Sequence, residues 1–256
     1  SDYYLLKATM KLLIITPYYA PAWGYGGPPK LLSEFAKSMV KRGHQVAVVT
    51  TDALDHRRNP KLSQTIAGVK VYRLRNISNW LAFKQKFFWP LGASEFLNQI
   101  ASKYDFIFVS DWRHGLNIAA YQAAKRFNKP YSVAAFGQLP VTSDWKGGFK
   151  RIFDLVYGKK ILKSASILFA QTNQEIAAYK KIVNHNNIAL WPLAIDLKAF
   201  AKLSKRGGFR KKYNLKSTDK IVLFVGRFHR YKGIDKLIQA VAELKSKLAI
   251  KLVLVG

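Results

Sequence analysis

The sequence predicts an α/β fold with a doubly wound parallel sheet, and three observations predict it. Short apolar runs recur through the 256 residues, segments with apolar residues at helical spacing separate them, and a Gly- and Pro-rich segment follows the first run. Parallel strands need crossover connections that are usually helical, so this alternation is typical of successive βαβ units. In such folds the loops at the carboxyl ends of the strands line the ligand crevice.

The first βαβ unit is expected between residues 11 and 51. Residues 11–16 form a short apolar run suited to a buried strand. Residues 17–30 contain four Pro and three Gly, which predicts a long irregular loop. Residues 31–43 have apolar residues at helical spacing and end in Gly, and residues 45–51 return as an apolar strand.

The same alternation continues to the end of the chain. Further strands are expected at 69–74, 105–110, 131–136, 166–172, 188–193, 221–226 and 251–256, and further helices at 116–127, 148–163 and 234–247. We expect a leader or tag at 1–9, a first domain at 10–197, a basic connection at 198–220 and the first βαβ unit of a second domain at 221–256. One βαβ unit is too small to bury its own faces, so we expect this second domain to be incomplete.

Composition limits the chemistry that the chain can perform. Its 43 Lys and Arg against 14 Asp and Glu give a net charge of +29, and 49% of the residues are hydrophobic. This balance permits a packed core and predicts attraction to the phosphates of nucleotides, nucleic acids or anionic lipids. The sequence has no Cys, which excludes disulfides, thiolate metal sites and thiol nucleophiles. Its five His are isolated and no HExxH spacing occurs, so we expect neither a metal nor another cofactor.

The sequence also indicates where the protein works. No apolar run approaches the roughly 18 residues of a membrane span, and residues 1–9 lack the pattern of a secretory signal. We expect a cytoplasmic protein that is peripheral to the membrane. Nucleic acid is not an expected partner, because the sequence shows no zinc-finger spacing, helix-turn-helix signature or RNP-like strand.

Three segments carry a family resemblance: AWGYGG at 22–27, KRGHQVAVVT at 41–50 and VGRFHRYKGIDKLIQA at 225–240. In this order they resemble a family 4 glycosyltransferase. The resemblance implies the GT-B fold, in which two Rossmann-like domains face a cleft. Residues 10–197 would be the acceptor domain, and residues 221–256 the start of a truncated second Rossmann domain that binds the nucleotide-sugar donor.

Arg227 and Lys232 are the candidate catalytic residues. They follow an expected strand and precede an expected helix, where two cations and free helix amides can hold a diphosphate. The resemblance implies that they bind the donor diphosphate and stabilise it as it leaves. The alternative is a solvated basic loop in a very basic protein.

Candidate substrate-binding residues lie at the ends of the other strands. They are Gly26, Gly27, Ser110, Asp111, His114, Gly137 and Glu175. The glycines let backbone amides approach an anion, although a structural turn would also need them. Glu175 could serve only as a first-turn acid beside the helix dipole.

The sequence departs from the family at polar positions of the acceptor side. Phe136-Gly137 stands where relatives show His-Gly, Ser110 where many have His, and Leu193-Ala194 where a hinge Asn-Gly is usual. Either the acceptor is unusual or catalysis has decayed.

Two segments, 80–91 and 145–165, combine aromatic and basic residues. In the first, Trp80, Phe83, Phe87 and Leu91 would share one face of a helix. The residues expected to contact an anionic membrane surface are Trp80, Phe83, Lys84, Lys86, Phe87 and Trp89. The alternative is that the apolar faces are core and the lysines are solvated.

These observations favour a retaining glycosyltransferase that moves a hexose from a nucleotide-sugar to a polyprenyl-linked or polysaccharide acceptor. The family's glutamate pair for donor sugar and ribose would lie beyond Gly256, so we expect the chain alone to be inactive or weak. The alternative is an acceptor- or membrane-binding domain that acts with a separate chain carrying the rest of the donor domain.

Overall fold

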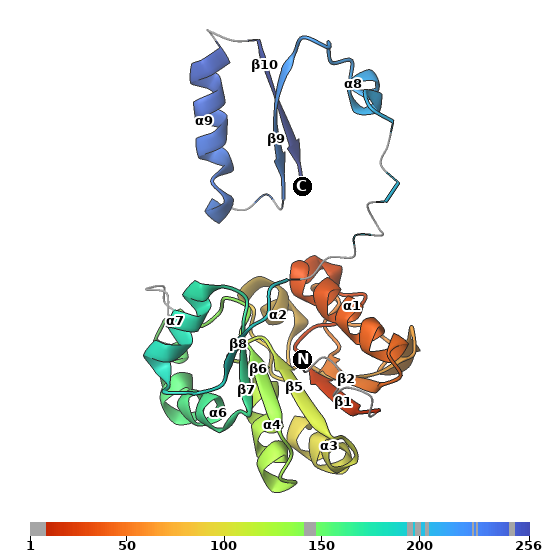
Figure 1. Ribbon diagram of the computed structural model, residues 1–256, viewed down its shortest axis with the longest axis vertical. Helices are drawn as coiled ribbons and strands as arrows, with labels where there is room; N and C mark the ends of the chain where they lie inside the picture. The colour runs from red at the N-terminus through yellow and green to blue at the C-terminus, as the bar shows by residue number, and fades with distance from the viewer. Residues whose placement is uncertain are drawn as a thin grey trace, which may run out of the picture. The chain divides into compact units, whose positions relative to one another are not determined.

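A computed structural model describes residues 9–140, 147–193, 197, 201–202, 205–226, 228, 230–245 and 249–256 (Figure 1). The chain divides into two compact units, Ser1–Asp196 and Leu197–Gly256. Both contain parallel strands joined by helices, as the sequence predicts.

The first unit contains an eight-stranded sheet with the strand order β3-β4-β2-β1-β5-β6-β7-β8. Its strands are β1 Lys11–Ile15, β2 Gln45–Thr51, β3 Ser63–Ile66, β4 Val69–Leu74, β5 Phe106–Ser110, β6 Tyr131–Ala134, β7 Ile167–Ala170 and β8 Ile188–Leu190. All neighbours pair in parallel except β3 and β4, which form an antiparallel hairpin. The predicted doubly wound parallel sheet is therefore confirmed.

The central strand β1 explains why the strands read as continuous apolar runs. Leu13 and Ile15 pack into the core on one face of the sheet, and Leu12 and Ile14 pack into the core on the other. A strand that is buried on both faces shows no polar alternation. Strand β1 pairs with β2 on one side and with β5 on the other, so the winding reverses between β1 and β5. Their carboxyl ends flank the topological switch point of the sheet.

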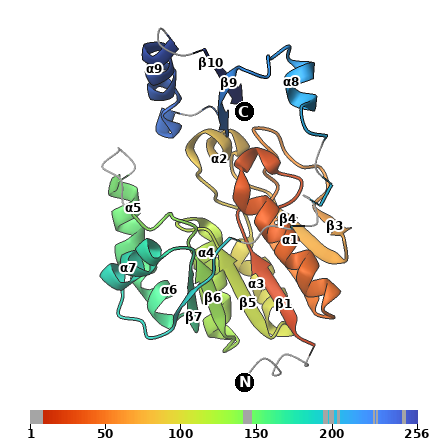
Figure 2. The same cartoon turned by 45° about the horizontal axis from the view of Figure 1, so that its top comes forward.

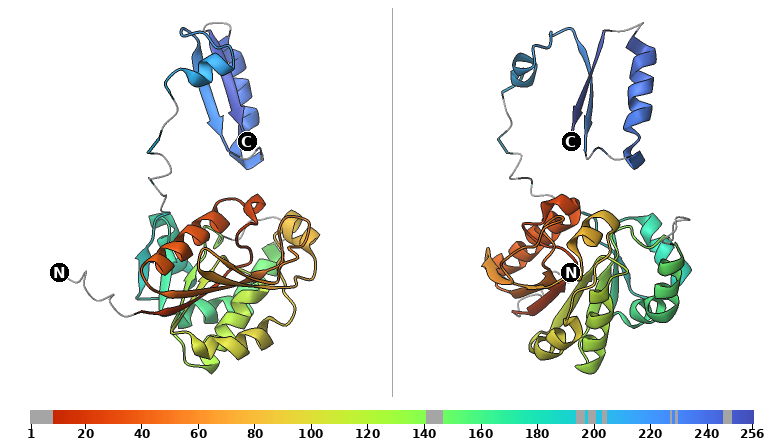
Figure 3. Two further views of the ribbon diagram at one scale, coloured as in Figure 1. Left: turned by 90° about the vertical axis from the view of Figure 1, so that its right-hand side faces the viewer. Right: turned by 180° about the vertical axis from the view of Figure 1, so that it is seen from behind.

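Helices cover both faces of this sheet. They are α1 Gly27–Lys41, α2 Asn79–Gln85, α3 Ala93–Ile100, α4 Gly115–Arg126, α5 Gly147–Phe153, α6 Lys159–Ser164 and α7 Asn173–Ile182. Leu32 of α1 packs into one core, whereas Leu97 of α3, Leu116 of α4 and Ile161 of α6 pack into the other. Figures 2 and 3 show α1 across the sheet from α3 and α4.

The second unit contains a short helix and one βαβ unit in its described part. The elements are α8 Gly208–Lys212, β9 Lys220–Val225, α9 Ile234–Lys245 and β10 Ile250–Val255. Strands β9 and β10 pair in parallel along their whole length. The strand–helix–strand order predicted for 221–256 is therefore present.

The start of α1 differs from the prediction. The helix begins at Gly27 rather than at Leu31, because Pro28 and Pro29 lie in its first turn. Pro is tolerated there, since first-turn amides have no partner within the helix. The hairpin of β3 and β4 is also absent from the sequence prediction.

Two predicted helices are interrupted. Helix α2 ends at Gln85, because Lys86 adopts a left-handed conformation with φ of 58°. The segment 80–91 is therefore not one helix, and the predicted shared face of Trp80, Phe87 and Leu91 is wrong. The helix expected at 148–163 is split into α5 and α6 by a π-helical turn at Asp154–Gly158.

Gly68 should be a sensitive position for stability. It closes the β3–β4 hairpin with φ of 81°, and a Cβ there would lie 2.8 Å from Cγ1 of Val40. We expect Gly68→Ala to lower the free energy of unfolding by about 2–3 kcal/mol, through backbone strain and overpacking. Urea unfolding measures the change. Gly148→Ala is the control, because a Cβ at Gly148 meets nothing within 4 Å; an equal loss there would contradict the explanation.

Candidate functional site

A cavity of about 750 Å³ lies at the carboxyl ends of β1 and β5, at the switch point of the sheet. Its walls come from the loops after β1, β5 and β6, from α2 and the segment after it, and from the start of α5. The lining residues are Pro17, Tyr18, Leu81, Gln85, Lys86, Phe87, Phe88, Asp111, Trp112, Arg113, His114, Gly137, Gln138, Pro140, Phe149 and Lys150. Open α/β sheets bind their ligands at this position.

Asp111 places a buried carboxylate in the wall of the cavity. Only 1% of the residue is exposed. Its Oδ1 accepts hydrogen bonds from the Tyr18 hydroxyl and from Nε2 of Gln138, and its Oδ2 accepts a bond of 3.3 Å from the Ser110 hydroxyl. Burial raises the pKa of Asp111 to about 6, although these hydrogen bonds act to lower it. Each carboxylate oxygen has two accepting positions, so Oδ2 can accept a further hydrogen bond.

The loop after β5 holds Asp111 in a conformation that side chains disfavour. Asp111 and Arg113 both have φ of 64°. The backbone amide of Asp111 donates to the carbonyl of Ala134 at 2.9 Å, and its carbonyl accepts from Nδ2 of Asn117 at 3.2 Å. Such strain persists where the surroundings fix the backbone, and it concentrates at functional sites.

Arg113 ties this loop to the loop after β6. Its guanidinium donates to the backbone carbonyls of Gln138 and Leu139 and pairs with both carboxylate oxygens of Asp154, at 3.0 and 2.7 Å. The Arg113 side chain is 5% exposed. Asp154 begins the π-helical turn, a feature often found near functional sites. The ion pair therefore joins β5, β6 and α5 around the cavity.

His114 is a neutral residue at the start of α4. Its Nε2 lies 3.1 Å from the carbonyl of Ser110, so Nε2 carries the proton. Nδ1 is buried without a hydrogen-bond partner among the described residues. Burial lowers the pKa of His114 to about 4, so the ring carries no charge at neutral pH.

Glu175 supports the loop that contains Gly137. Its Oε1 accepts from the Gly137 amide at 2.7 Å, and its Oε2 accepts from the Gln171 amide at 2.8 Å. Glu175 is 7% exposed and stands in the first turn of α7, next to the capping residue Thr172. The structure thus ties this carboxylate to two loops at the carboxyl edge of the sheet.

Gly26 and Gly27 lie at the N-terminus of α1. Gly26 has φ of 98°, and a Cβ on Gly27 would meet nothing within 4 Å. Pro28 and Pro29 carry no amide hydrogen, so the first turn offers fewer donors to an anion than an ordinary helix.

Aromatic residues support the loop before α1. Tyr18 stacks on Tyr25 with 4.9 Å between the ring centroids, and both rings contact Phe88. Tyr18, Tyr19 and Tyr25 are buried. Of the four aromatic residues in the described segment 17–30, Trp23 is the one that is exposed.

The expected diphosphate site falls in the second unit. Arg227 lies outside the described residues. Lys232 is exposed and lies in a short 3₁₀ turn, Arg230–Lys232, between the carboxyl end of β9 and α9. This position agrees with the strand-end location that the sequence predicts for Lys232.

The residues expected at a membrane occupy α2 and the segment that follows it. Trp80, Lys84 and Lys86 are exposed, and Phe83 packs against the cluster around Tyr25. Phe87 and Trp89 are exposed and stack on each other, with ring centroids 6.2 Å apart.

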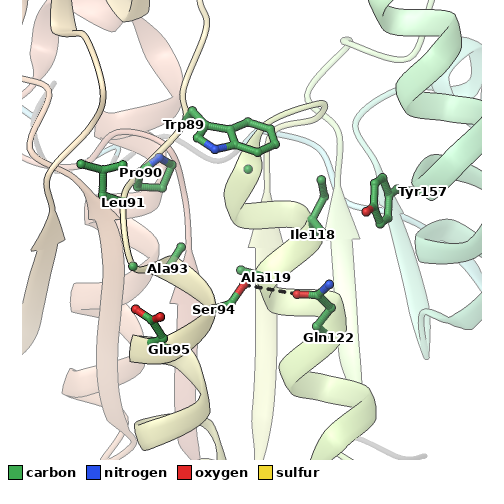
Figure 4. A pocket seen from close by; sticks show the side chains of 12 residues that line it. Trp89, Pro90, Leu91, Ala93, Ser94, Glu95, Ile118, Ala119, Gln122 and Tyr157 are labelled. Atoms are coloured by element: carbon green, nitrogen blue, oxygen red, sulfur yellow. Dashed lines mark hydrogen bonds between the residues drawn. The ribbon is translucent and has the colours of Figure 1, made fainter.

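Trp89 also borders a second pocket of about 380 Å³ between α3 and α4. Figure 4 shows its indole ring above this pocket and Tyr157 at one side, with Ser94 and Gln122 joined by a hydrogen bond of 3.2 Å.

The structure brings together five of the seven predicted substrate-binding residues. Asp111, His114 and Gly137 line the cavity, Ser110 bonds to Asp111, and Glu175 bonds to the Gly137 amide. Sequence reasoning missed Gln138, Arg113 and Asp154. Acids are scarce in this chain, and that scarcity is the signal that could have identified Asp154.

Within the described residues, no group of three or more His, Cys, Asp or Glu is placed to hold a metal ion. No helix in this part of the chain has the length and apolar character needed to cross a membrane.

Residues 26–193 match the family described as glycosyl transferase 4-like domain, and residues 205–256 match the glycosyl transferases group 1. A glycosyltransferase of Methanocaldococcus jannaschii is 26% identical to the chain over 265 residues, covering 96% of this chain and 63% of that protein. The chain thus spans less than two thirds of the length of this relative.

Solved structures with similar folds include GT-B glycosyltransferases. Sucrose-phosphate synthase from Thermosynechococcus elongatus has a TM-score of 0.70 at 19% identity, covering 96% of this chain and 62% of its own. HepE from Anabaena, in complex with UDP and glucose, has a TM-score of 0.66 at 16% identity, and the match covers 96% of this chain and 60% of HepE. Starch synthase IV of Arabidopsis thaliana, bound to ADP and acarbose, has a TM-score of 0.62 at 12% identity, and the match covers 97% of this chain and 69% of the synthase chain. The GT-B expectation for the fold is confirmed.

Asp111 and His114 should make opposite contributions to the pH dependence of stability. The raised pKa of Asp111, about 6 instead of 3.8, makes the free energy of unfolding fall as the pH rises from about 4 to 6. The lowered pKa of His114, about 4 instead of 6.5, makes it fall as the pH drops through the same range. The difference in unfolding free energy between Asp111→Asn and the unmodified chain should therefore increase by about 2–3 kcal/mol when the pH is raised from about 4 to 6.5.

His114→Asn is the matched variant with the opposite sign, because it leaves the Asp111 effect unopposed. Urea unfolding at the two pH values measures both differences. The same pH profile in both variants and in the unmodified chain would contradict the assignment.

Proposed function

The chain belongs to the glycosyl transferase 4-like family, and on this basis we propose that it transfers a hexose from a nucleotide-sugar to a lipid-linked or polysaccharide acceptor, retaining the anomeric configuration. The observation that carries the proposal is the cavity at the switch point of the first unit, with the buried carboxylate of Asp111 in its wall. We assign this cavity to the acceptor.

Asp111 is suited to hold an acceptor hydroxyl. With a pKa of about 6 it is ionised at neutral pH, and Oδ2 can accept a hydrogen bond from a sugar hydroxyl. Tyr18 and Gln138 fix the other oxygen, so the carboxylate cannot rotate away without losing two bonds. His114, in the same wall, is neutral, and Asp111 is the one acid among the described residues that line the cavity.

We assign the donor diphosphate to Arg227 and Lys232. In the reaction the bond between the anomeric carbon and the diphosphate oxygen breaks, and its electron pair stays on the diphosphate. The acceptor oxygen forms the new bond to that carbon, and its proton passes to the oxygen of the leaving diphosphate. Two cations that follow β9 in the sequence would stabilise the charge that develops on the leaving group. The likeness to structures holding UDP and ADP supports a nucleotide donor.

Transfer should depend on Asp111. The chain alone is expected to transfer weakly, and we expect Asp111→Asn to lower this incorporation of radiolabelled hexose from UDP-glucose or ADP-glucose into acceptor by a further factor of about 10 to 100, because a hydrogen bond to a charged group is lost. Asp105→Asn is the matched control, since Asp105 precedes the amino end of β5, far along the strand from the cavity, and its carboxylate accepts a hydrogen bond from the Lys11 amide. Equal incorporation by both variants would remove Asp111 from the acceptor site. If the unmodified chain and both variants neither transfer hexose nor hydrolyse the nucleotide-sugar, the result would favour a binding domain that acts with a separate donor subunit.

Nucleotide binding should depend on Lys232. We expect Lys232→Ala to weaken UDP binding, measured by calorimetric titration, by about tenfold or more through loss of a charge-assisted contact. Lys251→Ala is the control, because Lys251 is an exposed residue near the amino end of β10. Unchanged affinity in Lys232→Ala would favour the solvated basic loop instead.

A further inference from the structure

The first unit concentrates its exposed apolar surface in two segments, residues 77–91 and 149–156. Thirteen large apolar side chains are exposed among the described residues 9–193, and nine of them belong to these segments. Ile152 and Leu155 are 64% and 75% exposed. Exposed apolar residues are usually scattered, so a concentration of this kind marks an interaction surface.

The two segments meet in space although about sixty residues separate them. The rings of Phe87 and Phe149 are in edge contact, with centroids 6.0 Å apart, and both line the switch-point cavity. Trp89 and Tyr157 border the second pocket together (Figure 4). We use the name apolar seam for six exposed apolar residues of these two segments: Trp80, Phe87, Trp89, Phe149, Ile152 and Leu155.

Phe88 fixes the first segment to the fold. It is 3% exposed, and its carbonyl accepts a hydrogen bond of 3.1 Å from the Gly115 amide at the start of α4. Phe87 and Trp89 therefore point outward because the residue between them is anchored inward. The fold of the first segment therefore keeps Phe87 and Trp89 exposed.

The segments that carry the apolar seam are also rich in basic residues. Residues 77–91 and 149–160 contain Lys84, Lys86, Lys150, Arg151, Lys159 and Lys160. Their one acid is Asp154, and both of its carboxylate oxygens bind Arg113. The surface thus combines exposed apolar groups with an excess of positive charge, the combination that suits the headgroup boundary of an anionic bilayer.

We propose that the apolar seam docks on an anionic lipid bilayer, and that it forms the membrane-facing mouth of the switch-point cavity. The aliphatic residues Ile152 and Leu155 favour lipid over glycan, because sugar rings stack on aromatic faces and gain little from exposed aliphatic groups. The proposal of bilayer docking rests on the apolar seam alone. Entry of an acceptor from the bilayer into the cavity rests on the proposed function: the acceptor is then an amphiphile whose polar head reaches Asp111 while its chain remains in the lipid.

Vesicle co-sedimentation tests the docking without requiring any transfer activity. The full 256-residue chain is mixed with vesicles of phosphatidylcholine containing about 30% phosphatidylserine, and with phosphatidylcholine vesicles alone, at low and high salt. We expect binding to the anionic vesicles that weakens at high salt. The double variant I152S/L155S should bind them at least about tenfold less, because it removes apolar area from the interface.

The matched control is L62S/L190S, which removes two exposed leucines outside the apolar seam. It should bind like the unmodified chain, and thermal unfolding should be unchanged in both double variants. Absence of vesicle binding at low salt would overturn the proposal, as would equal losses in the two double variants. If the chain binds soluble dextran but not vesicles, and I152S/L155S abolishes the dextran binding, the surface holds a glycan instead.

Transfer assays separate this proposal from the proposed function. Vesicle binding with no hexose transfer to any acceptor would support the docking and count against the proposed function, on which acceptor entry from the lipid rests. If I152S/L155S transfers hexose to soluble and membrane-held acceptors at the same rates as the unmodified chain, acceptor entry from the lipid is overturned and the transferase assignment stands.

Discussion

The burial of the Asp111 carboxylate is the constraint on which the site depends. A charge without water must be satisfied by hydrogen bonds, and Asp111 takes them from Tyr18 after β1, Gln138 after β6 and Ser110 at the end of β5. These three strands lie side by side across the switch point. One desolvated group therefore sets the spacing of three loops, and the cavity is the space between them.

Other acids act in the same way at this edge of the sheet. Asp52 follows β2, is 1% exposed, and accepts from Arg58, from the Asn76 amide and from Asn79. Asp154 pairs with Arg113, and Glu175 joins the loops after β6 and β7. In a chain of 43 basic and 14 acidic residues, the few buried acids tie loops together while the many bases remain at the surface. Polar satisfaction, rather than net charge, shapes the carboxyl edge.

The sequence predicted the sheet because its strands are buried on both faces, and such runs stand out from their surroundings. Asp111, His114 and Gly137 could be identified because they directly follow such runs. The pairing of Arg113 with Asp154 could not, since 41 residues separate them and only the packed fold brings them together. Periodicity also failed at 80–91, where inward burial of Phe88 and the left-handed Lys86 override the helical pattern. Local spacing predicts elements well, whereas long-range burial decides where they stop.

The π-helical turn at Asp154–Gly158 accommodates one surplus residue within an otherwise α-helical rod. Because the extra residue is absorbed within this turn, the α-helical turns on either side keep nearly the directions that they would have in a rod one residue shorter. If the turn closed into regular α-helix with every residue kept, one side would rotate by about 100° relative to the other. Ile152 would then change its azimuth relative to Ile161, which is anchored in the core. The wide turn therefore sets the direction in which the outward face of the rod points.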